Sequence, residues 1–523
     1  MTTSARSKRP LGSNSAENDP KFVQHYVDTP AFARLLDDEC MIITGAKGSG
    51  KTALMRALSD IEAHRMRYAH VQSIKLDGLR FGPLYEAMKK LNSTSNQGLV
   101  AIARSTWQNV IAIYILEGLL DTKLLPTRVR TDLRKYLHDT GHLGTPAADK
   151  FVGHLERVWQ LIAKWSRDNE GALSAPMMGL TTRQQSVIAA FPGDDRLDRL
   201  LGDAMRCLRD SKKRFLLCFD GLDSVVEHSI ESRDYVFAGL IDAVFKCKSH
   251  PMLADTLAMK VLLPKELAHG ATRLLRDLDK IDQFSANIHW TSDALADFMK
   301  RRLEEHLKTK QRSFEEVWRE YFPERLRNDV HGVEEDTWGY VLRHSLYRPR
   351  QVLLHVQEIL DEWDSRSPNQ PFRVDPTFIP NVVADSNVRL SQHVVNELRL
   401  DFPHLDALLR SFRGLPSVMP ALEITTRFER YLGISAERFD EAFVDLYNYG
   451  IFGVSASQHP SDPRRPSSAF MFGFMSRDFD RHVLGPMSDR SLIALAPMFA
   501  EYCGCRSSTV GVVSPSAQNW SSR

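Results

Sequence analysis

The fold is decided by the stretch Gly45-Ala46-Lys47-Gly48-Ser49-Gly50-Lys51-Thr52, which matches the pattern G-x-x-x-x-G-K-[ST] at every fixed position. An apolar run, Met41-Ile42-Ile43, precedes it and is typical of a buried strand. Residues 53–58 follow, with Leu54 and Leu58 at helical spacing. Strand, glycine-rich turn and helix in this order are the context that a phosphate-binding loop (P-loop) requires.

The residue types in this loop suit a nucleoside triphosphate and its metal. Glycines leave room for backbone N–H groups to close around phosphates, and the helix N-terminus adds partial positive charge. We therefore expect all eight residues of the loop to bind ATP. Lys51 is expected to reach the β and γ phosphates, and the Thr52 hydroxyl to ligate Mg²⁺.

Length and composition limit the remaining possibilities. The 523 residues exceed one compact core, so two or three domains are expected. A hydrophobic share of 43% and a net charge of +2 indicate ordinary globular composition and argue for neither a nucleic-acid coat nor a membrane partner. The six cysteines form no C-x-x-C pair, which fits a reducing cytoplasm. Residues 1–20 lack the apolar core of a signal peptide and are predicted to be a disordered arm.

A second motif lies at Phe215-Leu216-Leu217-Cys218-Phe219-Asp220-Gly221-Leu222-Asp223. Its five apolar residues predict a buried parallel strand with Asp220 at the carboxyl end, where ligands bind in open α/β sheets. Asp220 is then a Walker B aspartate that holds Mg²⁺ or its bound water, and Asp223 could orient the attacking water. The alternative is that Asp220 caps a turn and Asp223 is a solvated loop charge.

Three more strands are predicted around residues 70–76, 257–263 and 286–290, which alternate with helices and so favour a parallel sheet. The distance from Thr52 to Asp220 far exceeds the ~30 residues of one βαβ unit, so a helical insertion is expected at about 84–208. Within it, the apolar run 110–120 is too short to span a membrane and is interpreted as a buried helix.

A helical lid is predicted for residues 291–364, beginning with a helix at 293–307 that Thr291 or Ser292 caps. The next helix of this lid begins at Tyr347-Arg348-Pro349-Arg350. Arginines are disfavoured at a helix N-terminus by the dipole, so they indicate an anionic partner such as a phosphate. Two solvated arginines in a turn remain the alternative.

The C-terminal part predicts a winged helix. Helices near 402–412, 422–432 and 436–449 precede a hairpin at 451–454 and 469–474, and a last helix is expected at 492–499. The third helix carries Glu437, Asp440, Glu441 and Asp445 against Arg438, which would repel a phosphate-lined groove. Arg464 and Arg465 in the wing are the expected phosphate contacts, so DNA is possible but disfavoured.

Together these features predict an α/β P-loop NTPase core, a parallel sheet with helices on both faces, with a helical insertion, a helical lid and a C-terminal winged helix. The expected domains are a disordered arm, the core, the lid, a linker, the winged helix, and a C-terminal helix and tail: 1–20, 21–290, 291–364, 365–380, 381–485 and 486–523.

With the phosphate loop, the D-G-L-D turn and the R-P-R element in hand, the chain resembles STAND-type ATPases with NACHT-like cores. The resemblance implies a cytoplasmic, ATP-dependent switch, often in bacterial stress response or antiviral defence, that acts through homo-oligomers or an effector protein. It implies that Arg350, or else Arg348, senses the nucleotide. Ser224 stands where the family usually has an acid, so hydrolysis could be slow or could depend on Asp223 alone. Lys265 stands where the family usually has the arginine of the first sensor.

A DNA-associated ATPase of the origin-recognition or helicase-loader type is the alternative function. It shares the core and the winged helix, whereas the acidic third helix argues against it. A small-molecule kinase is a third possibility that the D-G-L-D turn fits poorly.

Overall fold

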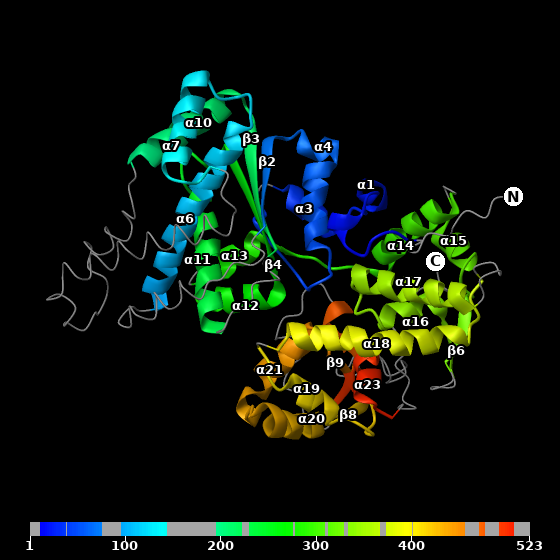
Figure 1. Cartoon of the computed structure of the whole chain (residues 1–523). Coiled ribbons are helices and arrows are strands. Elements are labelled where there is room, and N and C mark those ends of the chain that lie inside the picture. The colour runs from blue at the N-terminus through cyan, green and yellow to red at the C-terminus, as the bar shows by residue number, and fades with distance from the viewer. Residues whose placement is uncertain are drawn as a thin grey trace. The chain divides into compact units, whose positions relative to one another are not determined.

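The computed structural model describes residues 11–37, 39–75, 96–143, 195–221, 230–275, 278–308, 312–328, 333–366, 373–399, 401–455, 470–475 and 491–506. The chain divides into two compact units, shown in Figure 1. One unit is Pro30–Ile288, and the other combines Met1–Thr29 with His289–Arg523.

A five-stranded parallel sheet is the centre of the Pro30–Ile288 unit, and its strands lie in the order β2-β3-β4-β1-β5. All five predicted strands are present. Their bounds are β1 Ile42–Gly45, β2 Tyr68–Lys75, β3 Arg214–Asp220, β4 Leu257–Pro264 and β5 Ser285–Asn287. The non-consecutive order means that the chain crosses over between neighbouring strands, as parallel strands require.

The middle of this sheet is buried on both faces. In β3, Phe215, Leu217 and Phe219 join one hydrophobic cluster, while Leu216 and Cys218 alternate with them and are equally inaccessible to solvent. A strand covered on both sides reads as a continuous apolar run, which is why the sequence predicts it clearly. The strand ends at Asp220, as predicted.

Helices surround the sheet. They are α2 Pro30–Leu36, α3 Lys51–Asp60, α4 Glu62–Arg65, α6 Asn96–Leu120, α7 Thr127–Asp139, α10 Asp195–Asp210, α11 Ile230–Lys248, α12 Lys265–Arg273 and α13 Leu278–Gln283. The described part of the predicted insertion is helical. It packs directly on the sheet, because a Cβ on Gly118 of α6 would lie 2.7 Å from the Phe215 ring.

Helix α6 is longer than the apolar run suggests. Among the described residues, only its segment Leu99–Leu120 is long and apolar enough to cross a membrane. Of the apolar 18-residue stretch within this segment, 76% is buried inside the structure. Trp107 donates a hydrogen bond to the Val236 carbonyl of α11 (3.0 Å) and meets Phe219 edge to face. The interpretation as a buried helix agrees with this packing.

The other unit begins with the N-terminal segment, where the structure corrects the prediction of a disordered arm for residues 11–20. This segment forms η1 Ala16–Asn18 and leads into α1 Phe22–His25. Leu11 is buried, and its N–H donates to Gln357 (3.3 Å). The prediction relied on local polarity, whereas these contacts come from residues about 300 positions away along the chain.

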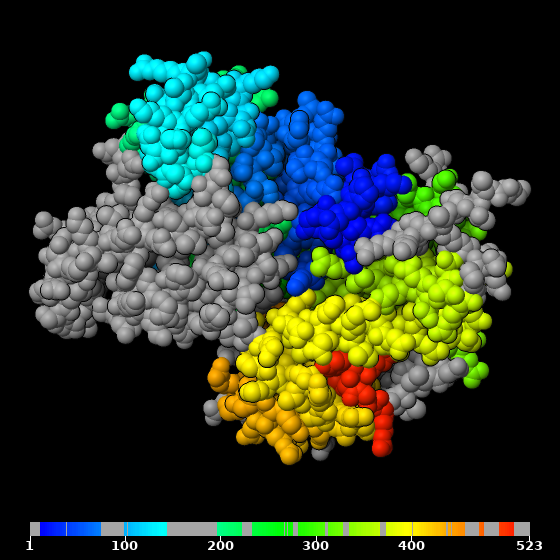
Figure 2. All heavy atoms as spheres, in the orientation of Figure 1, coloured from blue at the N-terminus to red at the C-terminus, as the bar shows by residue number. Residues whose placement is uncertain are grey.

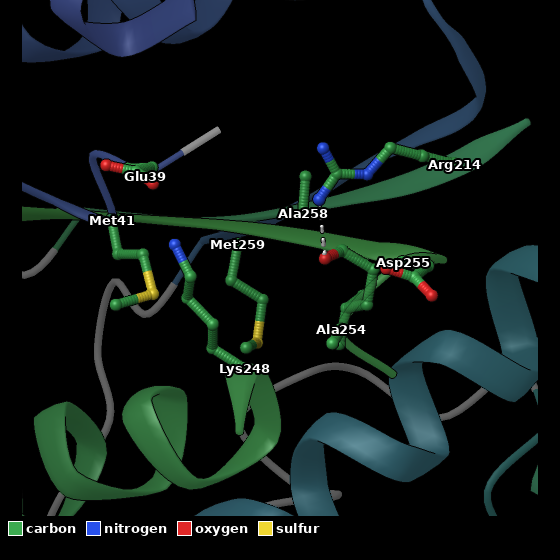
Figure 3. Close-up of a pocket in the computed structure, with 9 residues that line it drawn as sticks. Glu39, Met41, Arg214, Lys248, Ala254, Asp255, Ala258 and Met259 are labelled. Carbon is green, nitrogen blue, oxygen red and sulfur yellow. Dashed lines mark hydrogen bonds between the residues drawn. The ribbon is translucent and has the colours of Figure 1, made fainter. Parts of the chain in front are cut away.

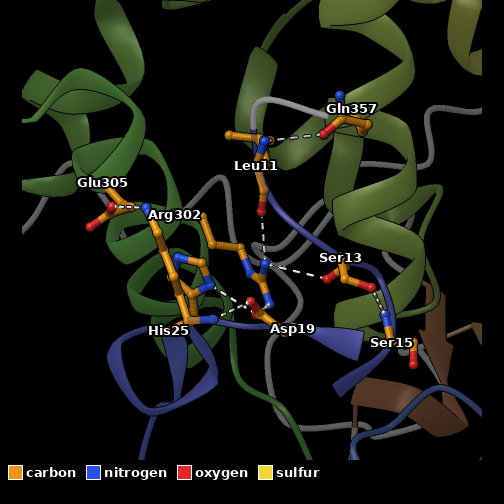
Figure 4. Close-up of polar contacts among 9 residues, drawn as sticks. Leu11, Ser13, Ser15, Asp19, His25, Arg302, Glu305 and Gln357 are labelled. Carbon is orange, nitrogen blue, oxygen red and sulfur yellow. Dashed lines mark hydrogen bonds and ion pairs between the residues drawn. The ribbon is translucent and has the colours of Figure 1, made fainter. Parts of the chain in front are cut away.

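Figure 4 shows the polar contacts that hold this segment against the helices that contain Arg302 and Gln357. Asp19 lies 2.8 Å from His25 Nδ1 and accepts from Arg302 (3.1 Å), and all three side chains are buried. Arg302 also donates to the Leu11 carbonyl (2.8 Å). We name these three side chains, Asp19, His25 and Arg302, the N-terminal clasp.

The helical part of this unit follows His289. Its elements are α14 Ser292–Leu307, α15 Phe314–Arg319, β6 Arg325–Asn328, β7 Val333–Asp336, α16 Thr337–Arg343 and α17 Pro349–Arg366. The predicted cap is confirmed, since the Thr291 side chain accepts from the Ala294 N–H (3.2 Å).

The predicted linker at 365–380 is wrong in its described part. Helix α17 continues to Arg366, the Val374 N–H donates to the Tyr321 carbonyl (2.9 Å), and α18 begins at Phe378. The described residues on both sides of 367–372 are therefore packed or helical, which a free spacer would not be.

Helix α18 Phe378–Glu397 joins two hydrophobic cores. Its first half contributes Ile379 and Val383 to the core of the helical part, and its second half contributes Leu390 and Val394 to the C-terminal core. Figure 2 shows α18 (yellow) against α23 Pro497–Cys503 (red), and Ser391 donates to the Met498 carbonyl (3.1 Å). The two parts therefore share one helix, which contributes to both hydrophobic cores.

The C-terminal part contains a four-stranded sheet in the order β10-β9-β11-β8. Its elements are α19 Leu405–Arg410, β8 Val418–Pro420, α20 Ala421–Arg427, the π-helical turn η3 Phe428–Leu432, α21 Ala436–Asn448, β9 Phe452–Ser455, β10 Phe470–Phe472, η5 Gly473–Met475 and β11 Leu492–Leu495. The three helices and the β9–β10 hairpin were predicted.

The predicted last helix is partly wrong. Residues 492–495 form β11, which pairs antiparallel with β8 and with β9, and the helix α23 begins only at Pro497. Two partner strands outweigh the local pattern, and proline is favoured in the first turn of a helix. The predicted boundary at 485 therefore cuts through the sheet of this part.

Candidate nucleotide site

The loop between β1 and α3 has the geometry of a phosphate cradle. Gly48 and Gly50 adopt φ values of 80° and 101°, in the left-handed region that glycine tolerates. A Cβ at Gly45 would lie 2.5 Å from Ser49 Oγ, so any other residue there would force Ser49 to move. These three positions let the loop turn tightly at the carboxyl end of β1, where the N-terminus of α3 begins.

Lys51 is held across this loop. Its Nζ donates to the carbonyl oxygens of Gly45 (3.0 Å) and Ala46 (3.2 Å), and the side chain is 4% exposed. Thr52 follows in the first turn of α3 and is half-buried, whereas Lys47 is exposed. A buried ammonium bonded to loop carbonyls can exchange these bonds for phosphate oxygens, which are stronger acceptors because they are charged.

Asp220 ends β3 and is 4% exposed. Strand β4 lies between β1 and β3, so Asp220 and the loop are at the same, carboxyl edge of the sheet. Lys265 begins α12 directly after β4, which places a lysine where the resemblance implies an arginine.

The donors at this edge suit magnesium. The Thr52 hydroxyl and the Asp220 carboxylate are oxygen ligands, and Mg²⁺ usually takes one or two such groups together with phosphate oxygens and water. Among the residues that the structure describes, no three His, Cys, Asp or Glu side chains group to hold a metal ion.

The two arginines of the R-P-R element differ in their surroundings. Arg348 is buried, and its Nη1 lies 3.4 Å from Glu397 Oε2 of α18. Arg350 lies in the first turn of α17 and is exposed. Both belong to the unit that holds His289–Arg523, whereas Lys51 belongs to the other. An ion-paired Arg348 leaves Arg350 as the better candidate for an anionic ligand.

Several predicted residues lie outside the described residues. They are Asp223 and Ser224 after β3, and Arg464 and Arg465 in the loop after β9. Their roles stay predictions.

Lys260 holds the turn that leads into β1, the strand before the phosphate loop. It was not singled out in the sequence analysis. It lies in β4, is 1% exposed, and donates to the carbonyls of Asp37 (2.6 Å) and Cys40 (2.5 Å) just before β1. A lysine inside an otherwise apolar strand was the only signal in the sequence.

A cavity of about 310 Å³ lies at the opposite edge of the sheet. Figure 3 shows its lining, which includes Met41 before β1, Arg214 at the start of β3 and Lys248 at the end of α11. Arg214 donates to the Leu257 carbonyl (3.2 Å), and Glu39 and Asp255 are exposed. This cavity is separate from the loop and belongs to the amino ends of the strands.

A parallel sheet with a phosphate cradle after β1 and a buried aspartate ending β3 defines a P-loop ATPase fold. Comparison with known proteins agrees. Residues 9–228 match the family described as ORC-CDC6-like, and residues 293–371 match a FunZ-associated C-terminal helical domain. No curated protein matches the chain.

Among solved structures, the chain is similar to the ORC2 protein of Aeropyrum pernix in its ADPNP-ADP complexes. The two share 11% identity, with 90% of this chain and 89% of that chain covered, at a TM-score of 0.35. A TM-score this low does not by itself establish a shared fold.

The family match supports the broader part of the resemblance, a P-loop ATPase. It supports a P-loop ATPase of the AAA+ class and gives no specific support to STAND or NACHT proteins. The phosphate loop cannot separate the two groups, because its glycines, lysine and threonine serve the same phosphate and metal chemistry in any P-loop ATPase.

Proposed function

We propose that the protein binds and hydrolyses ATP with Mg²⁺, and that the nucleotide controls its assembly or a partner protein. The observation that carries this proposal is the cradle after β1, with Lys51 bonded to the carbonyls of Gly45 and Ala46. A cytoplasmic role in bacterial stress response or antiviral defence is part of the proposal that follows from the resemblance alone.

Each polar group has a place in this scheme. The loop N–H groups bind the phosphates, Lys51 neutralises charge on the β and γ phosphates, and Thr52 and Asp220 hold Mg²⁺. Asp223 orients the attacking water, and Arg350 senses the nucleotide. Mg²⁺ supplies charge neutralisation between the β and γ phosphates when it is bound.

We expect Lys51→Ala to lower ATP affinity by about tenfold to a hundredfold, because a charged hydrogen-bonding partner of the phosphates is lost. The measurement is ATP binding by calorimetry, together with the size of the full chain in solution with ATP, ADP or neither. The parent should change size between nucleotides, and Lys51→Ala should not respond.

Lys123→Ala is the matched control, because Lys123 is an exposed lysine of the same unit, beyond the end of α6. Unchanged ATP affinity in Lys51→Ala would refute the phosphate-loop assignment. Binding of ATP without any change in size would refute control of self-assembly and leave a partner protein as the controlled species.

A second function is a DNA-associated ATPase of the origin-recognition type. The match of residues 9–228 to the ORC-CDC6-like family favours it. In this proposal the C-terminal part is a winged helix that contacts duplex DNA, with Arg464 and Arg465 in its wing. Support for a winged helix comes from the order of α20, α21 and the β9–β10 hairpin.

A further inference from the structure

The turn between α16 and α17 is strained. Leu346 and Tyr347 have φ values of 49° and 53°, in the left-handed region that residues with a bulky side chain seldom adopt. Such a conformation is unfavourable and persists only where surrounding contacts compensate. The turn immediately precedes Arg348-Pro349-Arg350.

The compensating contacts come from the C-terminal part. Leu346 is 2% exposed and belongs to the hydrophobic core of that part. The Tyr347 ring stacks on Phe474 with centroids 5.5 Å apart and planes at 26°. Phe474 stacks in turn on Phe472 of β10.

Gly450 completes this arrangement. A Cβ there would lie 2.6 Å from the Phe474 ring and 3.5 Å from a methyl group of Leu346. The strained turn, Gly450 shortly after α21 and Phe474 in η5 therefore meet at one place. No side chain larger than glycine fits at position 450 without moving the Phe474 ring.

This turn sets the start of the helix that carries Arg350. The Arg348 carbonyl accepts from the N–H groups of Gln351 (2.9 Å) and Val352 (3.0 Å), so Arg348 opens the first turn of α17. The ion pair between Arg348 and Glu397 of α18 also fixes the start of α17. A relaxed turn would change the backbone direction just before Arg350.

We propose that Tyr347 is a positioning residue for Arg350, and that its stack on Phe474 couples the C-terminal part to nucleotide sensing. The proposal rests on the proposed function, in which Arg350 senses the nucleotide. A partner that moves β10 would remove Phe474 from Tyr347, the turn would relax, and the start of α17 would shift. A change in the C-terminal part would thus alter the response to ATP.

The test measures ATP affinity and turnover of the full chain with Tyr347→Ala, Phe474→Leu and Arg350→Ala, alone and in pairs. We expect each single variant to change turnover by about tenfold, and Tyr347→Ala to have no further effect in the Arg350→Ala background. Tyr347→Phe, which keeps the ring, should behave as the parent. Circular dichroism of each variant verifies that the chain is folded.

Two outcomes would overturn this coupling while ATP binding through Lys51 still stands. One is an effect of Tyr347→Ala that is as large in the Arg350→Ala background as in the parent, which indicates an independent structural role. The other is normal turnover in Tyr347→Ala, Phe474→Leu or Arg350→Ala. Failure of the proposed function itself would appear separately, as unchanged ATP affinity in Lys51→Ala.

Discussion

Lys51 and Lys260 are two buried lysines whose ammonium groups bind backbone carbonyls, yet their surroundings separate their roles. The acceptors of Lys51 belong to the glycine-rich loop itself, where a phosphate can replace them. The acceptors of Lys260 belong to the turn before β1, within the packed interior. A buried charge must be paired or hydrogen-bonded. Phosphate oxygens could replace the carbonyl acceptors of Lys51, whereas the acceptors of Lys260 are part of the packed structure.

The substitution Asp220→Asn tests whether Asp220 binds Mg²⁺. The amide keeps the shape of the side chain but loses the charge that attracts Mg²⁺, so Mg²⁺-dependent turnover should fall on the order of a hundredfold while ATP still binds. The measurement is phosphate release over a range of Mg²⁺ concentrations.

Asp121→Asn is the control for this substitution, because Asp121 is exposed in the turn that follows α6. If the Asp220 variant matched the parent at every Mg²⁺ concentration, another residue would have to hold the metal.

The N-terminal segment shows how one element is ordered by another that is distant in sequence. Residues 11–25 have little apolar content, and their position depends on Arg302 of α14. Burial alone would raise the pKa of Asp19, but the hydrogen bond with His25 and the charge of Arg302 hold this pKa below the ordinary value of 3.8. The carboxylate form of Asp19 thus fastens the segment.

We expect Asp19→Asn to destabilise this segment by roughly 3 kcal/mol, because it leaves Arg302 buried without its charged partner. The stability that Asp19 contributes is fully present above its ordinary pKa of 3.8 and is lost as the pH falls through the lower folded pKa. The difference between variant and parent should therefore be largest near neutral pH and shrink in acid.

Trypsin cleavage after Lys21, followed by mass spectrometry, measures opening of this segment. Cleavage should be faster in Asp19→Asn than in the parent, and unchanged in Glu17→Gln, since Glu17 is exposed in the same segment. Equal cleavage of Asp19→Asn and the parent at pH 7 would show that the clasp does not order the segment.

At the scale of the whole molecule, the chain connects its two units after Thr29 and again after Ile288. The phosphate loop lies in one unit, and the R-P-R element and the C-terminal sheet lie in the other. Under the proposed function, a nucleotide-dependent change would be passed along one of these connections. The surface of the C-terminal part, where α21 carries exposed Asp440 beside exposed Arg438, would then select the partner.

DNA binding separates the two proposed functions. If the C-terminal part binds DNA, Arg464→Glu with Arg465→Glu should lower affinity and reduce the salt slope by roughly 0.9 for each lost phosphate contact. We expect instead that the parent binds duplex DNA weakly and that the double variant is unchanged, because the acidic residues of 435–450 repel phosphates.

The measurement is duplex DNA affinity of the full chain at several salt concentrations. Arg373→Glu with Arg399→Glu makes the same change in net charge at exposed positions of the same unit and serves as the control. Tight, salt-sensitive binding that only the wing variant loses would make the DNA-associated ATPase the leading function.

Local patterns in the chain were enough to predict the P-loop core. Neighbouring residues predicted the loop Gly45–Thr52, the buried strand that ends at Asp220 and a helix cap at Thr291 or Ser292, of which the structure has Thr291. The reason is physical: backbone conformation at glycine, continuous apolar burial and helix capping each depend on residues within a few positions.

Only the tertiary structure decided the order of the strands, the strand at Leu492–Leu495, the ordered N-terminal segment and the strained turn at Leu346 and Tyr347. Each depends on a partner far away in the chain. Val454 and Met419 pair with Ile493, Arg302 fastens Asp19, and Phe474 supports Tyr347. The free energy of such contacts does not appear in local propensity, and it can reverse a local preference because burial and pairing outweigh the small propensity differences between helix and strand.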